Sequence, residues 1–134
     1  MSWDGLTEGS ELVSKTVGPV TRTDIVRYQG ASGDLNPIHH DEPFAKESGF
    51  PAPVGVGMFH AGALAAWAAE QVGPRTVRRT RVRFRQPVFP GDLLTFAGRV
   101  VRRWTDETGE HLEAELSCSK EAGVCVQGWM TFTR

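Results

Sequence analysis

Two hydrophobic patterns divide the chain near Pro74. Before it lies an apolar, alanine-rich stretch of roughly four helical turns, residues 58–72, which Gly73 and Pro74 terminate. This stretch is apolar almost all round, so we expect a buried helix rather than one lying on the surface. After Pro74, apolar and polar residues alternate with period two, which predicts strands over residues 77–88, 93–104, 110–119 and 124–132. Short turns join these strands, which favours an antiparallel meander.

The part of the chain before this helix predicts shorter elements. Residues 11–20 alternate weakly and predict a first strand. A short helix follows as far as about Gly30, with Thr21 as its N-cap and Asp24 in its first turn, and another is expected over residues 42–48. One long apolar helix with several strands favours an α+β fold in which a sheet wraps around the helix. The 134 residues, 1–134, fit a single domain without a linker or an internal repeat.

Residues 33–41, Gly-Asp-Leu-Asn-Pro-Ile-His-His-Asp, place a carboxylate, an amide and an imidazole around one proline. Gly33 permits unusual backbone angles, and Pro37 fixes its own φ while disfavouring helix at the residue before it. A shaped loop that presents Asp34 and His39 is suited to holding a water molecule for proton transfer. The alternative is an ordinary turn, in which Asp34 caps the following segment.

A glycine-rich segment, residues 49–59, leads into the long helix. It brings backbone N–H groups to the helix N-terminus, where partial positive charge favours an oxyanion. The alternative is a helix start that needs small residues for close packing.

Residues 32–39 resemble the signature of the MaoC-like, R-specific enoyl-thioester hydratases. The pairs at 44–45 and 57–58, Phe-Ala and Gly-Met, and the turn at 87–92, Pro-Val-Phe-Pro-Gly-Asp, follow in the order that this family has them. The resemblance extends from about residue 6 to residue 132. It implies the hotdog fold, in which an antiparallel sheet wraps around a central helix.

The resemblance also implies a reaction. This is the hydration of trans-2-enoyl thioesters, or the dehydration of (R)-3-hydroxyacyl thioesters, carried on coenzyme A or an acyl carrier protein. Asp34 and His39 would hold the water, with His39 as the main base and Asp34 orienting the water and returning the proton. The Gly57 N–H would bind the thioester oxygen, while Asn36 and Ser32 would support the loop. No metal or redox cofactor is expected.

The chain departs from the family pattern at two positions. The family commonly has His before the Gly-Met pair, where this chain has Val56, and a serine on the central helix of some members falls on Ala65. Val56, Met58 and His60 are candidates to line an acyl pocket. For His60 the alternative is a core histidine with satisfied hydrogen bonds.

Six arginines fall within residues 75–85. On a strand, the four at 79, 81, 83 and 85 would share one face: Arg79, Arg81, Arg83 and Arg85. Arginine matches phosphate geometry, so this face is a candidate to bind the phosphates of coenzyme A or an acidic carrier protein. The alternative is a solvated sheet face or an edge guard. Nucleic acid is not expected, since no nucleic-acid motif or basic excess accompanies the cluster.

Composition limits the remaining possibilities. The net charge of −1 implies no general binding of polyanions. No apolar run reaches the length of a membrane span, and the start of the chain lacks the pattern of a signal peptide, so we expect a cytoplasmic protein without membrane attachment. Cys118 and Cys125 flank a predicted turn and are expected to be reduced thiols acting as small apolar residues. His111 lies beside a turn and is expected to be exposed.

A single sheet on one helix leaves an edge uncovered, so we expect a homodimer or a heterodimer with a related hotdog subunit. Two other functions stay open. The chain could be a non-catalytic partner subunit, although Asp34 and His39 are both present. It could also be a hotdog thioesterase, which would want a carboxylate on or near the central helix, where Glu70 is the only acidic residue.

Overall fold

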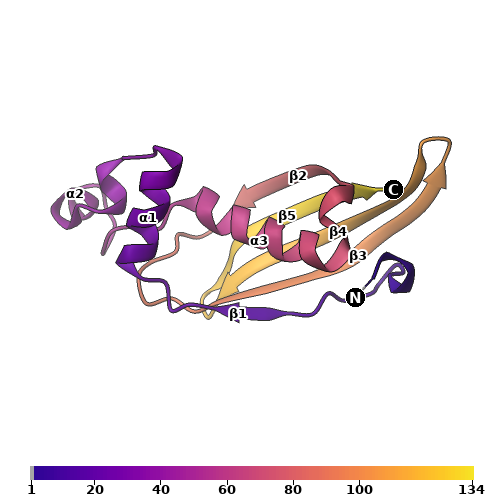
Figure 1. The fold of residues 1–134 in the computed structure, drawn as a ribbon. Coiled ribbons are helices and arrows are strands. Elements are labelled where there is room, and N and C mark those ends of the chain that lie inside the picture. Colours follow the sequence, from indigo (N-terminus) through magenta and orange to yellow (C-terminus); the bar gives the residue numbers. More distant parts are fainter. Residues whose placement is uncertain (1) are drawn as a thin grey trace.

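The structure, a computed structural model, describes residues 2–134. Its centre is a long helix, α3 (Gly57–Val72), packed against one face of a five-stranded antiparallel sheet (Figure 1). The strands are β1 (Lys15–Val17), β2 (Val77–Phe84), β3 (Leu94–Asp106), β4 (Gly109–Lys120) and β5 (Gly123–Thr133). The helices α1 (Arg22–Ser32) and α2 (Glu42–Glu47) lie together beyond the N-terminal end of α3. Short 3-10 helices cover Trp3–Gly5 (η1), Pro37–His39 (η2) and Pro74–Thr76 (η3). The predicted α+β class, with a sheet around a central helix, is confirmed.

The strand order differs from the predicted meander. The order is β1-β3-β4-β5-β2, so only β3, β4 and β5 follow one another as hairpins. β2 ends at Phe84 rather than at residue 88 and pairs with β5, with Arg81 opposite Trp129. Residues 85–93 then cross to β3 on the other side of the sheet. This link is longer than a hairpin turn, and Pro87 cannot donate to a ladder, so a strand ending earlier is physically consistent.

The predicted first strand is mostly irregular. Only Lys15–Val17 pairs with β3, and Glu11 adds an isolated bridge to Arg99. Gly18 interrupts the strand because its φ of 106° lies in the left-handed region, and a Cβ at this position would lie 2.8 Å from the Asp92 carbonyl oxygen. The close approach of these two segments therefore requires glycine.

The core lies between α3 and the inner face of the sheet. Residues such as Leu64 of α3, Leu112, Met130 and Phe132 are almost fully buried there. The expectation that α3 is buried all round is wrong for one stripe, because residues four apart are exposed along it: Met58, Gly62, Ala66 and Glu70. In the single chain, α3 has one open face (Figure 1).

Two further expectations concern polar and sulfur side chains. His111 is 8% exposed, not exposed as expected, because it stacks on Trp104 and bonds to Asp106 at 2.8 Å and Thr133 at 2.9 Å. Cys118 and Cys125 are both free and buried. Burial raises the pKa of Cys118 to about 12, so this thiol acts as a small apolar group.

Among residues 2–134, no helix combines the length and hydropathy needed to cross a bilayer.

Candidate active site

The loop that bears Asp34 begins where α1 ends. Thr21 starts α1 with a capping box, in which its hydroxyl accepts from the Asp24 N–H at 3.0 Å and the Asp24 carboxylate accepts from the Thr21 N–H at 3.0 Å. Gly33 ends the helix with φ at 77°, and its N–H donates to the Gln29 carbonyl at 2.9 Å. The left-handed backbone at Gly33 turns the chain out of the helix immediately before Asp34.

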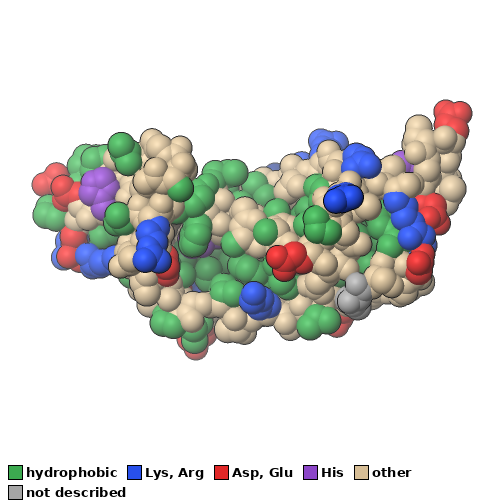
Figure 2. All heavy atoms as spheres, in the orientation of Figure 1, with side chains coloured by type: hydrophobic (Ala, Val, Ile, Leu, Met, Phe, Trp, Pro, Cys, Tyr) green, Lys and Arg blue, Asp and Glu red, His purple; other side chains and the backbone are tan. Residues whose placement is uncertain are grey.

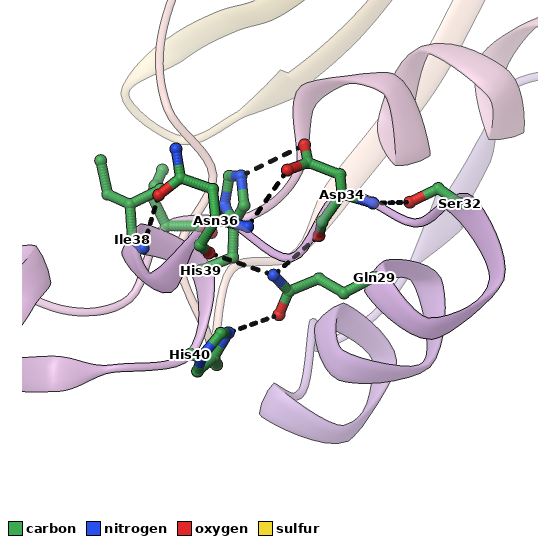
Figure 3. A network of polar contacts seen from close by, with 8 residues as sticks. Gln29, Ser32, Asp34, Asn36, Ile38, His39 and His40 are labelled. Atoms are coloured by element: carbon green, nitrogen blue, oxygen red, sulfur yellow. Dashed lines mark hydrogen bonds and ion pairs between the residues drawn. The ribbon is translucent and has the colours of Figure 1, made fainter.

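Local hydrogen bonds shape this loop. The Ser32 hydroxyl accepts from the Asp34 N–H at 3.2 Å, and Asp34 Oδ1 accepts from the Asn36 N–H at 3.3 Å. Asn36 Oδ1 accepts from the Ile38 N–H at 3.0 Å and caps η2, with Pro37 at its first position. Ser32 and Asn36 thus both hold the loop by side-chain to backbone contacts (Figure 3).

Asp34 and His39 lie side by side in this loop. His39 Nε2 is 3.7 Å from Asp34 Oδ2, while His39 Nδ1 is 2.6 Å from the Val54 carbonyl oxygen. A carbonyl only accepts, so Nδ1 must bear the proton of this bond. In the neutral ring, Nε2 therefore has a free lone pair and faces the carboxylate. The His39 side chain is largely buried, whereas that of Asp34 is about half exposed.

The next two residues, His40 and Asp41, have other contacts. His40 Nδ1 bonds to the side-chain oxygen of Gln29 at 3.1 Å, away from His39 (Figure 3). Asp41 Oδ1 accepts from the Phe44 N–H at 3.1 Å and caps α2. Within residues 2–134, no group of three or more His, Cys, Asp or Glu side chains could hold a metal ion.

Gly57 opens α3 and lines a cavity. The N-cap residue, Val56, makes no side-chain hydrogen bond to the helix, so no side chain caps the first turn. A Cβ on Gly57 would lie 2.8 Å from the Phe84 ring at the end of β2. Glycine here allows the end of β2 to pack directly against the start of the helix.

Two cavities lie against α3. One, of about 270 Å³, is lined by Gly57, His60, Phe84 and Arg85 among others. The second, of about 350 Å³, lies toward β1 and β3 and is lined by His60, Phe59, Trp67 and Phe96 among others. Of the three acyl-pocket candidates, only His60 lines these cavities. Val56 is buried outside both linings, and Met58 is 55% exposed.

His60 differs from the expected satisfied core histidine. The residue is 2% exposed, and its Nε2 has no hydrogen-bond partner among residues 2–134. Burial lowers the pKa of His60 to about 4, against a smaller attraction from Asp92. Nε2 also faces Gly55, where a Cβ would lie 2.6 Å away. His60 is therefore a neutral polar group in an apolar wall between two cavities.

Among the four candidate carrier-binding arginines, one also reaches the cavity beside Gly57. Arg79, Arg81 and Arg83 lie opposite Thr131, Trp129 and Gln127 of β5, on the sheet face away from α3. Arg81 stacks on Trp129, with its guanidinium carbon 4.7 Å from the ring centroid. Arg85 donates to the side chain of Gln127 on the same face at 3.2 Å and also lines the cavity beside Gly57. Of these four arginines, Arg85 alone lines the cavity beside Gly57.

Sequence reasoning missed two residues of this site, Gln29 and Val54. Val54 contributes only its carbonyl, which no pattern of side chains could reveal. Gln29 has a detectable signal, because it lies four residues after the buried Ile25 and therefore on the inner face of α1. A glutamine on such a face needs buried hydrogen-bond partners.

A family model described as a MaoC like domain matches residues 7–131. The 3-hydroxyacyl-thioester dehydratase Y of Mycobacterium tuberculosis is 39% identical over 118 residues, which cover 81% of this chain and 41% of that protein. The chain spans 8%, 9% and 65% of the lengths of three other curated relatives that it matches.

Solved structures agree in architecture. The (R)-hydratase from A. caviae involved in PHA biosynthesis has a TM-score of 0.82 at 21% identity, over 96% of this chain and 97% of that chain. The ChsH1-ChsH2 complex from Mycobacterium tuberculosis has a TM-score of 0.83 at 19% identity, over 95% and 97%. This likeness shows a shared hotdog fold. Because the family model matches almost the whole sequence, the chain belongs to the MaoC-like domain family.

Proposed function

We propose that this chain hydrates trans-2-enoyl thioesters and, in reverse, dehydrates (R)-3-hydroxyacyl thioesters. The observation that supports this most directly is the Asp34–His39 pair. The bond from Nδ1 to the Val54 carbonyl leaves His39 Nε2 as an acceptor 3.7 Å from Asp34 Oδ2. The names of relatives, among them a 3-hydroxyacyl-thioester dehydratase and an (R)-hydratase, agree with this reaction.

In the hydration direction, His39 Nε2 accepts one proton of a water molecule as the water oxygen bonds to Cβ of the enoyl group. Asp34 Oδ2 accepts a hydrogen bond from the other proton and keeps the water oxygen aimed at Cβ. The proton taken by His39 Nε2 then passes to Asp34 Oδ2 and from there to Cα, while the other water proton stays on the new hydroxyl, so both side chains recover their initial protonation states. General acid–base groups of this kind typically contribute about 10²–10⁴-fold to rate.

Electrons of the former Cα–Cβ double bond move onto the thioester oxygen during this addition. We propose that the Gly57 N–H donates to this oxygen, because the first turn of α3 has no side-chain cap and its dipole favours negative charge. The cavity beside Gly57 would then receive the first carbons of the acyl chain. His60 would border this chain, and the second cavity gives space beyond it.

A partner subunit would have one strand edge and one helix face of this chain to cover. β2 lies at the end of the sheet, so its outward edge is unpaired in the single chain. The open stripe of α3 exposes Met58 and Ala66, and hydrophobic side chains gather on the surface over α3 (Figure 2). We propose a second copy or a related hotdog subunit as the cover. Light scattering at micromolar concentration should give twice the chain mass, and a monomer that still hydrates substrate would contradict this.

The reaction is tested by hydration assays with short and longer trans-2-enoyl thioesters of coenzyme A, with free thiol measured in the same tube. We expect loss of the enoyl group without thiol release. Thiol release at the rate of substrate loss would indicate a thioesterase. An inactive chain that becomes active with a second hotdog subunit would indicate a partner role.

A further inference from the structure

Gln29 of α1 is a polar side chain that is only 2% exposed. Its amide nitrogen donates to the carbonyl oxygens of Asp34 at 2.9 Å and Asn36 at 3.1 Å. Its oxygen accepts from His40 Nδ1 at 3.1 Å. One buried side chain therefore contacts the loop on both sides of Leu35 and again after η2 (Figure 3).

The orientation of the Gln29 amide follows from these partners. Both carbonyl oxygens only accept, so the group facing them must be the NH₂ with its two protons. A flipped amide would place its oxygen against two carbonyl oxygens and lose both bonds. His40 Nδ1 must then be the donor toward the Gln29 oxygen. Every polar atom of the Gln29 side chain has a partner in this arrangement.

These contacts reach Asp34 and His39 through the backbone. Gln29 holds Asp34 by its carbonyl group. The Asn36 carbonyl accepts both from Gln29 and from the His39 N–H, at 3.2 Å. The Gln29 side-chain amide thus donates a hydrogen bond directly to the Asp34 carbonyl. It also shares the Asn36 carbonyl as an acceptor with the His39 N–H. The separation of the two functional side chains depends on the peptide groups that Gln29 fixes.

We propose that Gln29 is a positioning residue, which sets the geometry of Asp34 and His39 for water addition. The catalytic part of this inference rests on the proposed function. Gln29 does not touch the reacting atoms; it acts by restricting the loop, with His40 holding its other end. Misplacing a catalytic group by about 1 Å can reduce turnover roughly 10²-fold, so loss of this clamp should lower kcat with little effect on KM.

Two substitutions separate hydrogen bonding from packing. Gln29→Met keeps the length and bulk of the side chain but removes both donated bonds. Gln29→Glu keeps the shape but places carboxylate oxygen against the two carbonyl oxygens. The matched control is Thr21→Ala, which removes the hydroxyl that accepts from the Asp24 N–H and destabilises the start of the same helix without touching the loop.

We expect Gln29→Met to lower kcat at least about 10-fold with KM within about 2-fold, since positioning is lost rather than binding. Gln29→Glu should lose at least as much. The amide protons of Asn36, Ile38 and His39 should exchange faster by NMR in both variants. Thr21→Ala should lower Tm yet keep kcat and the exchange of these three amides near wild type.

The proposal is overturned if kcat stays near wild type in Gln29→Met, or if Gln29→Glu is as active as wild type, which would leave only packing. It is also overturned if Thr21→Ala lowers kcat as much at equal loss of Tm. Failure of the proposed function is distinguished from failure of this proposal, because in the first case the wild-type chain itself would be inactive. In that case, unchanged exchange of the loop amides in Gln29→Met would overturn the positioning role, and faster exchange would support it.

Discussion

The loop of residues 32–40 and the arginine face of β2, which comprises Arg79, Arg81 and Arg83, both place polar side chains at close spacing. In the loop, the Val54 carbonyl accepts a hydrogen bond from His39, and Asp34 lies beside His39. The Gln29 side chain donates to the Asp34 carbonyl. On the arginine face, Arg81 stacks on Trp129, but Arg79 and Arg83 make no side-chain hydrogen bond or ion pair within residues 2–134. Clustering of polar residues in sequence therefore does not distinguish a fixed site from a solvated face; the number of partners does.

The largest expected effect tests the fixed side of this comparison. His39→Ala and Asp34→Asn should each lower hydration turnover by at least about 10²-fold, because each removes a group that holds or deprotonates the water. Far-UV circular dichroism and Tm should stay near wild type. Steady-state kinetics on enoyl-coenzyme A decides it, and near-normal turnover in either variant would remove that residue from the mechanism.

A backbone group extends the comparison to the start of α3. Gly57→Pro removes the proposed N–H donor, and proline is well tolerated at the first helical position. The extended backbone of Val56, with φ −75° and ψ 116°, also suits a following proline. This variant and its control are both made in a Phe84→Ala background, because the Phe84 ring would otherwise clash with the side chain introduced at position 57. In that background we expect kcat about 10²-fold lower than in the matched Gly57→Ala variant, which keeps the N–H. Equal rates would exclude this donor.

His60 is a third case, fixed by burial but without a partner at Nε2. The pKa of His60 in the folded state is about 4, below the ordinary value of 6.5. Above pH 6.5, His60 is therefore unprotonated in both the folded and the unfolded chain. As pH falls from about 6.5 to 4, the unfolded chain takes up the proton first, and the free energy of unfolding drops by roughly 1 kcal/mol per pH unit. When the free energy of unfolding is measured with urea at several pH values in this window, it should fall more steeply with decreasing pH for wild type than for His60→Leu. Parallel curves would contradict the burial of a neutral imidazole.

The smallest effect concerns the arginine face. Replacing Arg81 and Arg83 by Gln should raise KM for a coenzyme A or carrier-protein thioester by about 10-fold or less, with kcat changed little, because remote charge binds ground and transition states alike. Salt should weaken the effect. The control replaces Arg99 and Arg102 of β3 by Gln. An unchanged KM, or an equal loss with a short uncharged thioester, would make these arginines an ordinary solvated face.

The sequence predicted those features that local chemistry decides. Thr21 marks the start of α1 as predicted, although the helix runs to Ser32 rather than ending at about Gly30, and the bends around Asn36 and Pro37 come from residues with few backbone options. The sequence could not place β2, because pairing with β5 depends on where the link of residues 85–93 crosses. It also misplaced His111, whose burial comes from stacking on Trp104 across the β3–β4 hairpin.

The candidate site was partly accessible for the same reason. Asp34 and His39 are close in sequence, so a short loop brings them together. Gln29, by contrast, can be assigned to the Ile25 face of α1, but its contacts with the loop follow only from how α1 packs against that loop. The open stripe of α3 could not be separated from a buried helix, since Met58, Gly62 and Ala66 have the same small or apolar character as the buried positions.

The central claim is that Asp34 and His39 add water across an enoyl thioester. Its most direct measurement is NMR of the product formed from trans-2-enoyl-coenzyme A in heavy water. We predict a hydroxyl group at Cβ in the R configuration, one deuterium at Cα and an intact thioester, formed at least about 10²-fold more slowly by His39→Ala. Free thiol, an S product, or equal product from His39→Ala would contradict the account.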